Sequence, residues 1–388
     1  MADARTAPFA PYRRVGTALA VTVLLFALAE LAANARDPTD RDFIAFWAAA
    51  KLALAGSPAA AYDNGALHAV QAEAVRFTRP AAQMPFAYPP AFLALVLPFG
   101  WLSFPAALAA WVVVSLAAFV LAVRRMFPRS GLLALAFPPV LVNAALGQNG
   151  FVTAALLVGG LALLPRRPLA AGLLLGALAV KPQLALLVPV ALLAGSHWRA
   201  IAGAAASAAA VLLVGLAAFG PEATRAWLGQ MPLYAEIARE GLVGWPRLAS
   251  VYAAGRQAGL PAEPALALHL AVAAAAALTV WRVWRSQAEP LAKASVLCAA
   301  SMLASPYLFL YDALILAVPL LWLAARGAPP ALVGALWLLP AVTIAQSFGF
   351  EGPVNLMPLL PLALLAIAWR EAAPQYRARM NSRARPYS

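Results

Sequence analysis

The feature that most constrains this chain is its series of apolar runs, which follow one another from end to end with short polar breaks between them. Runs that could form helices lie at 15–34, 86–100, 105–123, 131–146, 150–164, 168–180, 182–195, 199–219, 264–281, 291–304, 306–325, 328–346 and 354–369. Hydrophobic residues make up 64% of the 388 residues and charged residues only 11%, whereas soluble domains carry about 25% charged residues. The sequence therefore predicts an all-α polytopic membrane protein, with one integral membrane domain over 1–388.

Several runs are shorter than the roughly 20 residues that a straight span needs, so the predicted number of transmembrane helices is about 11 to 13. Proline and glycine interrupt many runs, for example at Pro138, Gly147, Pro182 and Pro306. Half-helices of this kind are tolerated where protein or a watery cavity covers the freed backbone groups. The interruptions therefore indicate a site embedded in the membrane domain.

Basic residues lie in short clusters between the runs, not along one amphipathic face. The clusters lie at 124–129, 166–167, 197–199, 282–285 and in the tail 370–388. Cytoplasmic loops carry an excess of Lys and Arg, so these clusters are predicted to be cytoplasmic. The net charge of +13 then reflects orientation in the bilayer, and no nucleic-acid partner is predicted.

The polar segments 35–84 and 220–263 are predicted to be the first and second outer loops. Two arguments conflict over the first. Counting back from Arg124 through two full spans places 35–84 inside, whereas a first helix with a basic N-terminus places it outside. Because the first helix usually dominates, the segment is predicted to lie outside, with one early run that does not cross fully.

The first outer loop holds four of the six aspartates: Asp37, Asp40, Asp42 and Asp63. Carboxylates are costly inside hydrocarbon, so a water-facing edge is where they stay ionised. Asp42 precedes apolar residues at helical spacing, which predicts an amphipathic helix on the membrane surface. Either Asp40 and Asp42 only cap that helix, or Asp42 acts as a general base on an acceptor hydroxyl. Asp40 and Asp42 have the spacing of a metal-binding pair, but one base suffices, so neither a metal nor another cofactor is predicted.

Other polar residues mark breaks between runs. Tyr62 and Asp63 follow a turn signal, so Asp63 is a turn residue or a supporting partner of the site. Tyr88 stands where the next helix begins, where an aromatic ring can face a lipid headgroup. Gln148 and Asn149 form either a tight turn or a bend that meets a phosphate.

Lys181 is one of only three lysines in the chain and lies between two apolar runs. An ammonium there needs an anionic partner or must reach the membrane interface. A phosphate is one such partner, and Asp312 is another. Asp312 itself interrupts an apolar run near Tyr307 and should face a polar cavity or a basic residue.

Taken in order, these segments resemble glycosyltransferase family 87, the polyprenol-phosphate-mannose-dependent α-mannosyltransferases of the GT-C superfamily. The matching positions are Asp42-Phe43 with Phe46, Gly56, Tyr62-Asp63, Tyr88-Pro-Pro90, Asn143 with Gly147-Gln148-Asn149, Ala171-Gly172, Lys181-Pro182 and Ser305-Pro306-Tyr307. The resemblance covers roughly residues 15–325. Members often carry a His near the Ser-Pro segment that meets the donor phosphate, and this chain has none there.

The resemblance implies a GT-C-type bundle with its catalytic site on the outer face of a bacterial plasma (inner) membrane. It implies a polyprenyl-phosphate-linked sugar donor, a glycolipid or glycan acceptor, and Asp42 as the catalytic base of an inverting transfer. Donor-binding candidates are Lys181, Gln148, Asn149, Tyr307 and Tyr88, and supporting candidates are Asp40, Asp63, Tyr62 and Asp312. A transporter or flippase for a lipid-linked or anionic solute explains the broken helices equally well. It does not explain why the aspartates gather in one loop.

Overall fold

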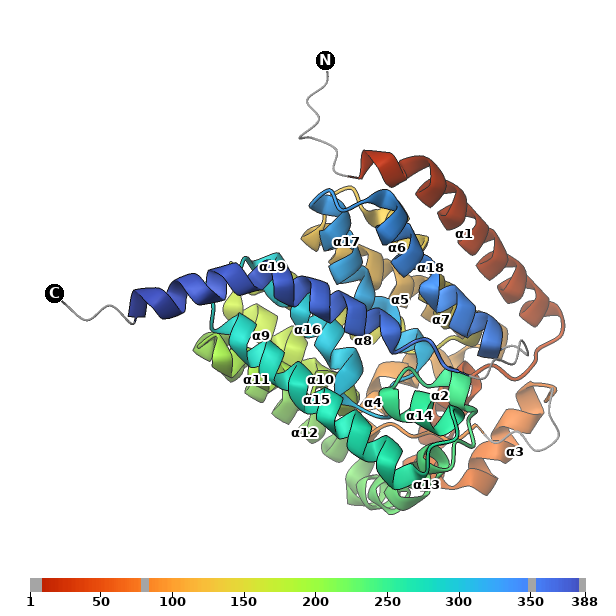
Figure 1. Ribbon diagram of the computed structural model, residues 1–388. Coiled ribbons are helices and arrows are strands. Elements are labelled where there is room, and N and C mark those ends of the chain that lie inside the picture. The colour runs from red at the N-terminus through yellow and green to blue at the C-terminus, as the bar shows by residue number, and fades with distance from the viewer. Residues whose placement is uncertain (1–8, 78–83, 348–353, 384–388) are drawn as a thin grey trace.

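The computed structural model describes residues 9–77, 84–347 and 354–383, so 78–83 of the first outer loop and the end of the basic tail lie outside the described residues. The described chain is almost entirely helical (Figure 1), and its extended pairings are two isolated β-bridges, Thr39 with Arg76 and Leu248 with Phe309. The prediction of an all-α membrane protein is confirmed.

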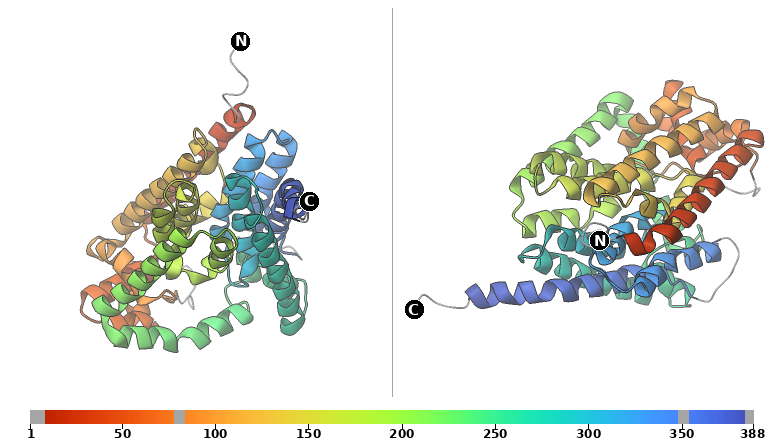
Figure 2. Two further views of the ribbon diagram at one scale, coloured as in Figure 1. Left: turned by 90° about the vertical axis from the view of Figure 1, so that its left-hand side faces the viewer. Right: turned by 90° about the horizontal axis from the view of Figure 1, so that it is seen from above.

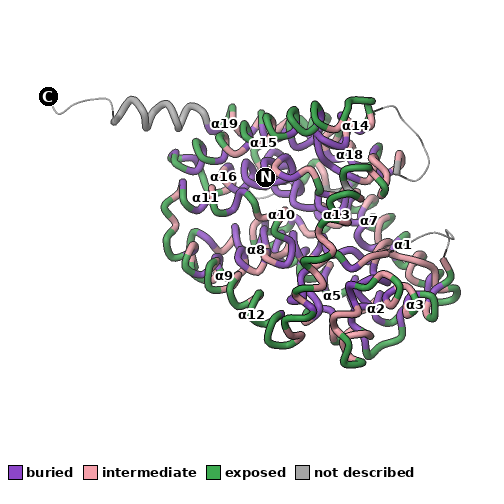
Figure 3. The backbone as a smooth tube through the Cα atoms, turned by 90° about the horizontal axis from the view of Figure 1, so that it is seen from below, coloured by how far each residue is buried: buried purple, intermediate pink, exposed green. Residues whose placement is uncertain are grey.

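Four helices in the described ranges are long and apolar enough to cross a membrane, judged by length and composition. They are Arg14–Arg36 within α1 (Arg13–Arg36), α5 (Phe104–Met126), Trp198–Ile237 across α12 (Trp198–Gly229) and α13 (Met231–Arg239), and α15 (Ala262–Trp284). Large apolar side chains on the outer sides of these helices are exposed, including Leu212, Leu213 and Leu270. Figure 3 shows the buried residues gathered inside this exposed outer layer.

Most of the remaining apolar runs form shorter helices, as the prolines and glycines within them predict. The last helix is an exception with 25 residues, and some of the short helices lie in the polar segments 35–84 and 220–263. Toward the N-terminus they are α2 (Phe43–Leu54), α3 (Asn64–Ala74), α4 (Pro90–Val96), η4 (Leu97–Trp101), α6 (Gly131–Leu135), α7 (Pro138–Leu146), α8 (Gly150–Leu163), α9 (Pro168–Gly176) and η5 (Ala177–Val180). Further on they are α10 (Pro182–Ala185), α11 (Val188–Ala194), η6 (Trp245–Arg247), α14 (Val251–Gln257), α16 (Pro290–Ala304), η7 (Leu310–Leu316), α17 (Ala317–Ala325), α18 (Pro330–Ser347) and α19 (Leu359–Arg383).

The bundle has two distinct ends. At one, which we call the loop end, α2, α3, α13 and α14 gather at the lower right of Figure 1. At the other, which we call the basic end, the Tyr12 hydroxyl donates to the Ala328 carbonyl at 3.2 Å. There Arg326 also pairs with Glu289 and Glu371. The start of α1 and the last turns of α19 lie away from the loop end in Figures 1 and 2.

The run at 86–100 explains the conflict over the first outer loop, because it does not carry the chain to the basic end. It forms α4 and η4, which pack back along α2, with the Trp47 indole donating to the Leu102 carbonyl at 3.0 Å. The next helix, α5, starts at the loop end, where Phe104 stacks against Phe43. The segment 37–103 therefore leaves and returns at the same end of the bundle.

Helix α2 differs from its predicted position on the membrane surface, and that prediction is wrong. All eight residues from Phe43 to Ala50 are buried, so protein surrounds this part of the helix on every side. Phe43 and Phe46 pack in an aromatic cluster with Phe92 and Trp111. The apolar spacing read as one face toward lipid is instead part of a helix inserted into the interior.

The segment 220–263, which is predicted to be the second outer loop, is largely helical. Gly220 adopts φ +78°, which bends the chain at the end of the apolar part of α12 and before Pro221. The chain then continues through α13, where the Tyr234 hydroxyl donates to the Phe86 carbonyl at 2.9 Å. This bond ties the segment 220–263 to the start of the run at 86–100.

Candidate active site

Asp42 is at the N-cap position, immediately before α2, but its side chain makes no capping hydrogen bond. The capping alternative is therefore wrong for Asp42. Its carboxylate instead accepts a hydrogen bond from the Gln148 side-chain amide, with Nε2 and Oδ2 2.9 Å apart. The side chain is partly buried, so Asp42 is a carboxylate held in one orientation by a neutral donor.

The turn before α8 places Gln148 against Asp42. Gly147 adopts φ +65°, a conformation that L side chains rarely adopt, and a Cβ there would come within 2.6 Å of Phe43. Only glycine lets the turn approach α2 so closely. The backbone N–H of Gln148 donates to the backbone carbonyl of Asn143, and the Trp111 indole donates to the backbone carbonyl of Gln148. The backbone of Gln148 is thus held on both sides.

The surroundings of Asp42 make its carboxyl a better proton acceptor than an ordinary one. Burial raises the pKa of Asp42, because it disfavours the charged form. The Gln148 hydrogen bond and the charges of Arg247 and Arg41 oppose this by lowering the pKa, whereas Asp40 raises it. A raised pKa suits a general base, which must bind a proton during the reaction.

Lys181 lies in a second, more deeply buried cluster. Its ammonium is 2.6 Å from Asp312 Oδ1 and 3.2 Å from Asn149 Oδ1, and it lies over the Tyr311 ring, 4.7 Å from the centroid. The other Asp312 oxygen accepts from the Phe309 backbone N–H at 3.0 Å. The carboxylate partner considered for Lys181 is therefore Asp312.

Tyr88 and Asn149 connect the two clusters. The Tyr88 side chain lies within hydrogen-bonding reach of Tyr311 and Asn149. The charges of Asp42 and Asp312 both act on it. Asn149 follows Gln148 in the chain and binds Lys181. The structure thus brings six of the predicted site residues together at the loop end: Asp42, Tyr88, Gln148, Asn149, Lys181 and Asp312.

The other predicted residues lie around this group or outside it. The Tyr62 hydroxyl donates to the Tyr88 carbonyl at 3.0 Å, which supports the backbone of Tyr88. Asp63 caps α3 by accepting from the Ala66 N–H at 2.8 Å, so its turn interpretation is confirmed. Asp40 is an electrostatic neighbour of Asp42. Tyr307 is 39% exposed. Its hydroxyl acts electrostatically on Tyr252 and does not contribute to the surroundings of Asp42.

Arg247 is a member of the site that the sequence interpretation missed. It is partly buried, and its positive charge lowers the pKa of Asp42. The next residue, Leu248, pairs with Phe309, and the Asn355 amide holds the Leu248 carbonyl at 2.7 Å. Among the described residues Arg247 has no acidic partner within ion-pair distance. The sequence carried no signal that singles out Arg247, because the segment 220–263 also contains Arg225, Arg239 and Arg256.

Comparison with known proteins places this chain in a family. Residues 86–306, more than half of the chain, match the profile of Glycosyltransferase family 87. The matched range contains Tyr88, Gln148, Lys181 and Arg247 and begins after Asp42. No curated protein and no solved structure matches the sequence significantly.

Proposed function

The chain belongs to glycosyltransferase family 87, and from that membership we propose that it transfers a hexose, mannose, from a polyprenyl-phosphate-linked donor to a glycolipid or glycan acceptor. The observation that supports this best is the Asp42–Gln148 pair, a partly buried carboxylate fixed at 2.9 Å by a neutral amide and free of an ion pair among the described residues. Membership also favours a transferase over the transporter alternative.

Asp42 would serve as the general base. The acceptor hydroxyl oxygen attacks the anomeric carbon of the donor while its proton passes to the Asp42 carboxylate. The new glycosidic bond forms as the bond from the anomeric carbon to the phosphate oxygen breaks, and the polyprenyl phosphate leaves with that electron pair. A single displacement of this kind inverts the anomeric configuration. The reaction needs no group beyond those supplied by the protein and the two substrates.

The departing phosphate gains negative charge, so positive groups placed where that charge develops speed the step. Arg247 suits this role, because its charge acts on Asp42 and it has no acidic partner within ion-pair distance in the described chain. The planar guanidinium can bind two phosphate oxygens at once.

Lys181, Gln148, Asn149, Tyr307 and Tyr88 remain proposed donor-binding residues. The Lys181 ammonium has three N–H donors, of which Asp312 and Asn149 occupy two. The third could meet the donor phosphate. Gln148 and Asn149 would present their side chains at the N-terminal end of α8, where backbone N–H groups favour an anion.

The proposed setting is a bacterial plasma membrane with the loop end facing the periplasm or the cell exterior. The clustering of Arg125, Arg166 and Arg326 at the opposite end supports this orientation, because cytoplasmic loops collect basic residues.

Donor use can be tested with the purified full-length protein. We expect label from polyprenyl-phosphate-mannose to enter lipid or glycan products, and a polyprenyl phosphate to copurify with the protein. Transfer from a nucleotide sugar but not from the lipid-linked donor would overturn the proposal.

Orientation needs a separate test. Ser57 is exposed at the loop end, whereas Cys298, the cysteine already present, is buried. In a Cys298→Ser background, Ser57→Cys should react with a membrane-impermeant thiol reagent on intact spheroplasts. The matched control is Ser57→Cys labelled after lysis. Labelling only after lysis would place the loop end in the cytoplasm.

A further inference from the structure

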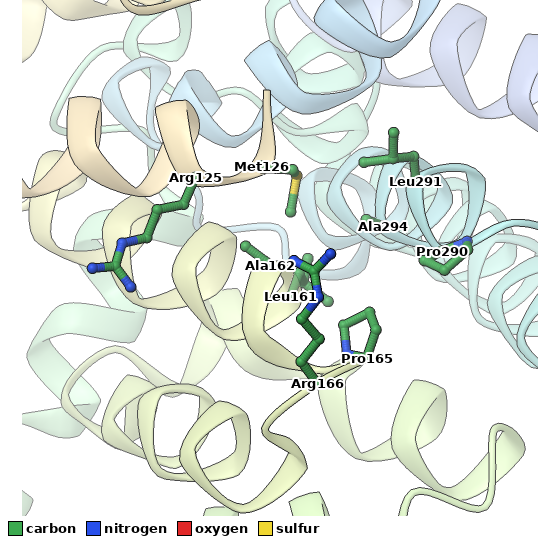
Figure 4. A pocket seen from close by; sticks show the side chains of 9 residues that line it. All are labelled: Arg125, Met126, Leu161, Ala162, Pro165, Arg166, Pro290, Leu291 and Ala294. Atoms are coloured by element: carbon green, nitrogen blue, oxygen red, sulfur yellow. The ribbon is translucent and has the colours of Figure 1, made fainter. Parts of the chain in front are cut away.

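A pocket of about 220 Å³ lies at the basic end of the bundle, at the opposite end of α8 from Asn149. Figure 4 shows the residues that line it: Arg125, Met126, Leu161, Ala162, Pro165, Arg166, Pro290, Leu291 and Ala294. They come from the ends of α5 and α8, the loop after α8, and the first turns of α16. Since α8 has 14 residues, the pocket is about 20 Å from the candidate active site along that helix.

The pocket combines an apolar wall with an unpaired cation. Met126, Leu161 and Leu291 supply apolar surface, and Arg166 points between them in Figure 4, while Arg125 extends away. Neither arginine has an acidic partner within ion-pair distance among the described residues. The neighbouring carboxylate, Glu289, accepts from Trp322 and Arg326 through its Oε1 oxygen and makes no ion pair with Arg125 or Arg166.

Two further features favour an anion in the pocket. The first turn of α16 forms one wall. Pro290 has no N–H, and the Lys293 N–H donates to the Glu289 carbonyl. The N–H groups of Leu291 and Ala292 are therefore those that lack an intrahelical partner and carry positive partial charge. A guanidinium beside such a turn binds phosphate oxygens well. The apolar residues below it would contact the carbon atoms attached to that phosphate.

We propose that this pocket binds the phosphate headgroup of an anionic glycerophospholipid from the membrane leaflet at the basic end. The phosphate would bind Arg166 with Arg125 at the rim, and the glycerol would contact Leu161 and Leu291. The acyl chains would continue along the exposed apolar helices. A lipid is the occupant because the pocket opens at the end of a membrane-spanning bundle and joins a charged group to an apolar wall. The site is separate from the sugar-transfer site.

The test uses purified full-length protein and measures bound lipid by native mass spectrometry while phosphatidylglycerol is titrated into the detergent. Arg166→Gln should weaken binding of one lipid by about tenfold or more, the loss expected for one charge-assisted phosphate contact. Arg125→Gln should weaken it less. Leu291→Trp should also reduce binding, by filling the pocket without changing the charge.

The matched control is Arg282→Gln, which removes an exposed arginine at the same end that does not line the pocket. This variant should bind phosphatidylglycerol as the wild type does. Phosphatidylcholine, which adds a positive charge to the headgroup, should bind weakly to every variant. Equal losses for Arg282→Gln and Arg166→Gln would mean general charge attraction and overturn the site.

A second arm separates a lipid from free phosphate. Inorganic phosphate should displace the lipid only weakly, because it lacks the carbon atoms that contact Leu161 and Leu291. The opposite outcome is that Arg166→Gln weakens binding of inorganic phosphate but leaves binding of phosphatidylglycerol unchanged. The pocket would then be a site for soluble anions, and the proposal would be wrong. Melting temperatures of all variants establish that each remains folded.

Discussion

Two aspartates lie close together at the loop end, and their surroundings differ in the way their proposed roles require. Asp312 is 1% exposed, faces an ammonium and accepts a backbone N–H with its other oxygen. Asp42 is partly buried, and its hydrogen-bond partner is the neutral Gln148. An ion-paired carboxylate with both oxygens occupied is a poor proton acceptor, whereas one held by a single amide keeps that capacity. The contrast separates the proposed base from a structural pair.

The largest expected effect comes from removing the proposed base. Asp42→Asn should lower sugar transfer by about 10²–10⁴-fold, with a melting temperature equal to or slightly above that of the wild type because a desolvated charge is lost. Initial rates with saturating donor measure this. Asp40→Asn, two residues away in the same segment, is the matched control and should lose much less. If Asp42→Asn retained more than a tenth of wild-type turnover, Asp42 would not be the base.

Breaking the buried pair should act on folding instead of chemistry. Lys181→Met leaves the Asp312 charge buried without its partner, which should destabilise the protein by about 3–5 kcal/mol. Asp312→Asn should have a similar effect, and the double variant should recover most of the loss. The measurement is thermal unfolding in detergent, which compares the stability of the wild type, the two single variants and the double variant.

The same double variant tests whether Lys181 contacts the donor. If Lys181 binds phosphate as well as Asp312, the stable double variant should still show a raised donor KM. A normal donor KM in the double variant would remove Lys181 from the donor-binding residues and leave it as a structural partner of Asp312.

Removing Arg247 should have an effect on catalysis without one on stability, because no ion pair is broken. Arg247→Gln should lower kcat/KM for the lipid-linked donor by about ten- to a hundredfold, the size expected for losing one charged hydrogen-bond donor. Arg225→Gln is the matched control in the same outer segment, where Arg225 pairs with Glu222 on the surface. Equal kinetics for the two variants would exclude Arg247 from phosphate binding.

The smallest expected effect is a shift in pH dependence. Asp42 must be ionised to accept a proton, so activity should fall as pH drops through its raised pKa. Gln148→Leu removes a hydrogen bond that lowers this pKa, so the acid limb of kcat/KM should move to higher pH. Folding should show the matching sign. The folded state holds the Asp42 proton more tightly than the unfolded chain, so this group favours folding at low pH and loses that contribution as pH rises.

The pH profile of Asp42→Asn should lack that limb, whatever activity remains. An acid limb that stayed at the same pH in Gln148→Leu would assign it to another group.

The helices and their breaks could be predicted from the sequence because apolar runs, prolines and basic clusters act locally. The pairing of Lys181 with Asp312 was one of three open alternatives, beside a phosphate and the membrane interface, since a buried lysine must find an anion but its partner lies 131 positions away. The burial of α2 could not be predicted, because residues at helical spacing look alike whether lipid or protein covers them. Arg247 was missed because only the pairing of Leu248 with Phe309 places it beside the site.

The return of 37–103 to the end of the bundle from which it leaves has a consequence for engineering. An inserted segment with an even number of crossings, or none, leaves the orientation of every later helix unchanged. This segment carries Asp42 and ends soon after the start of the region shared with the family at residue 86. The segment could therefore be exchanged between related chains without inverting the remaining bundle. Such chimeras would show whether this segment or the rest of the protein selects the acceptor.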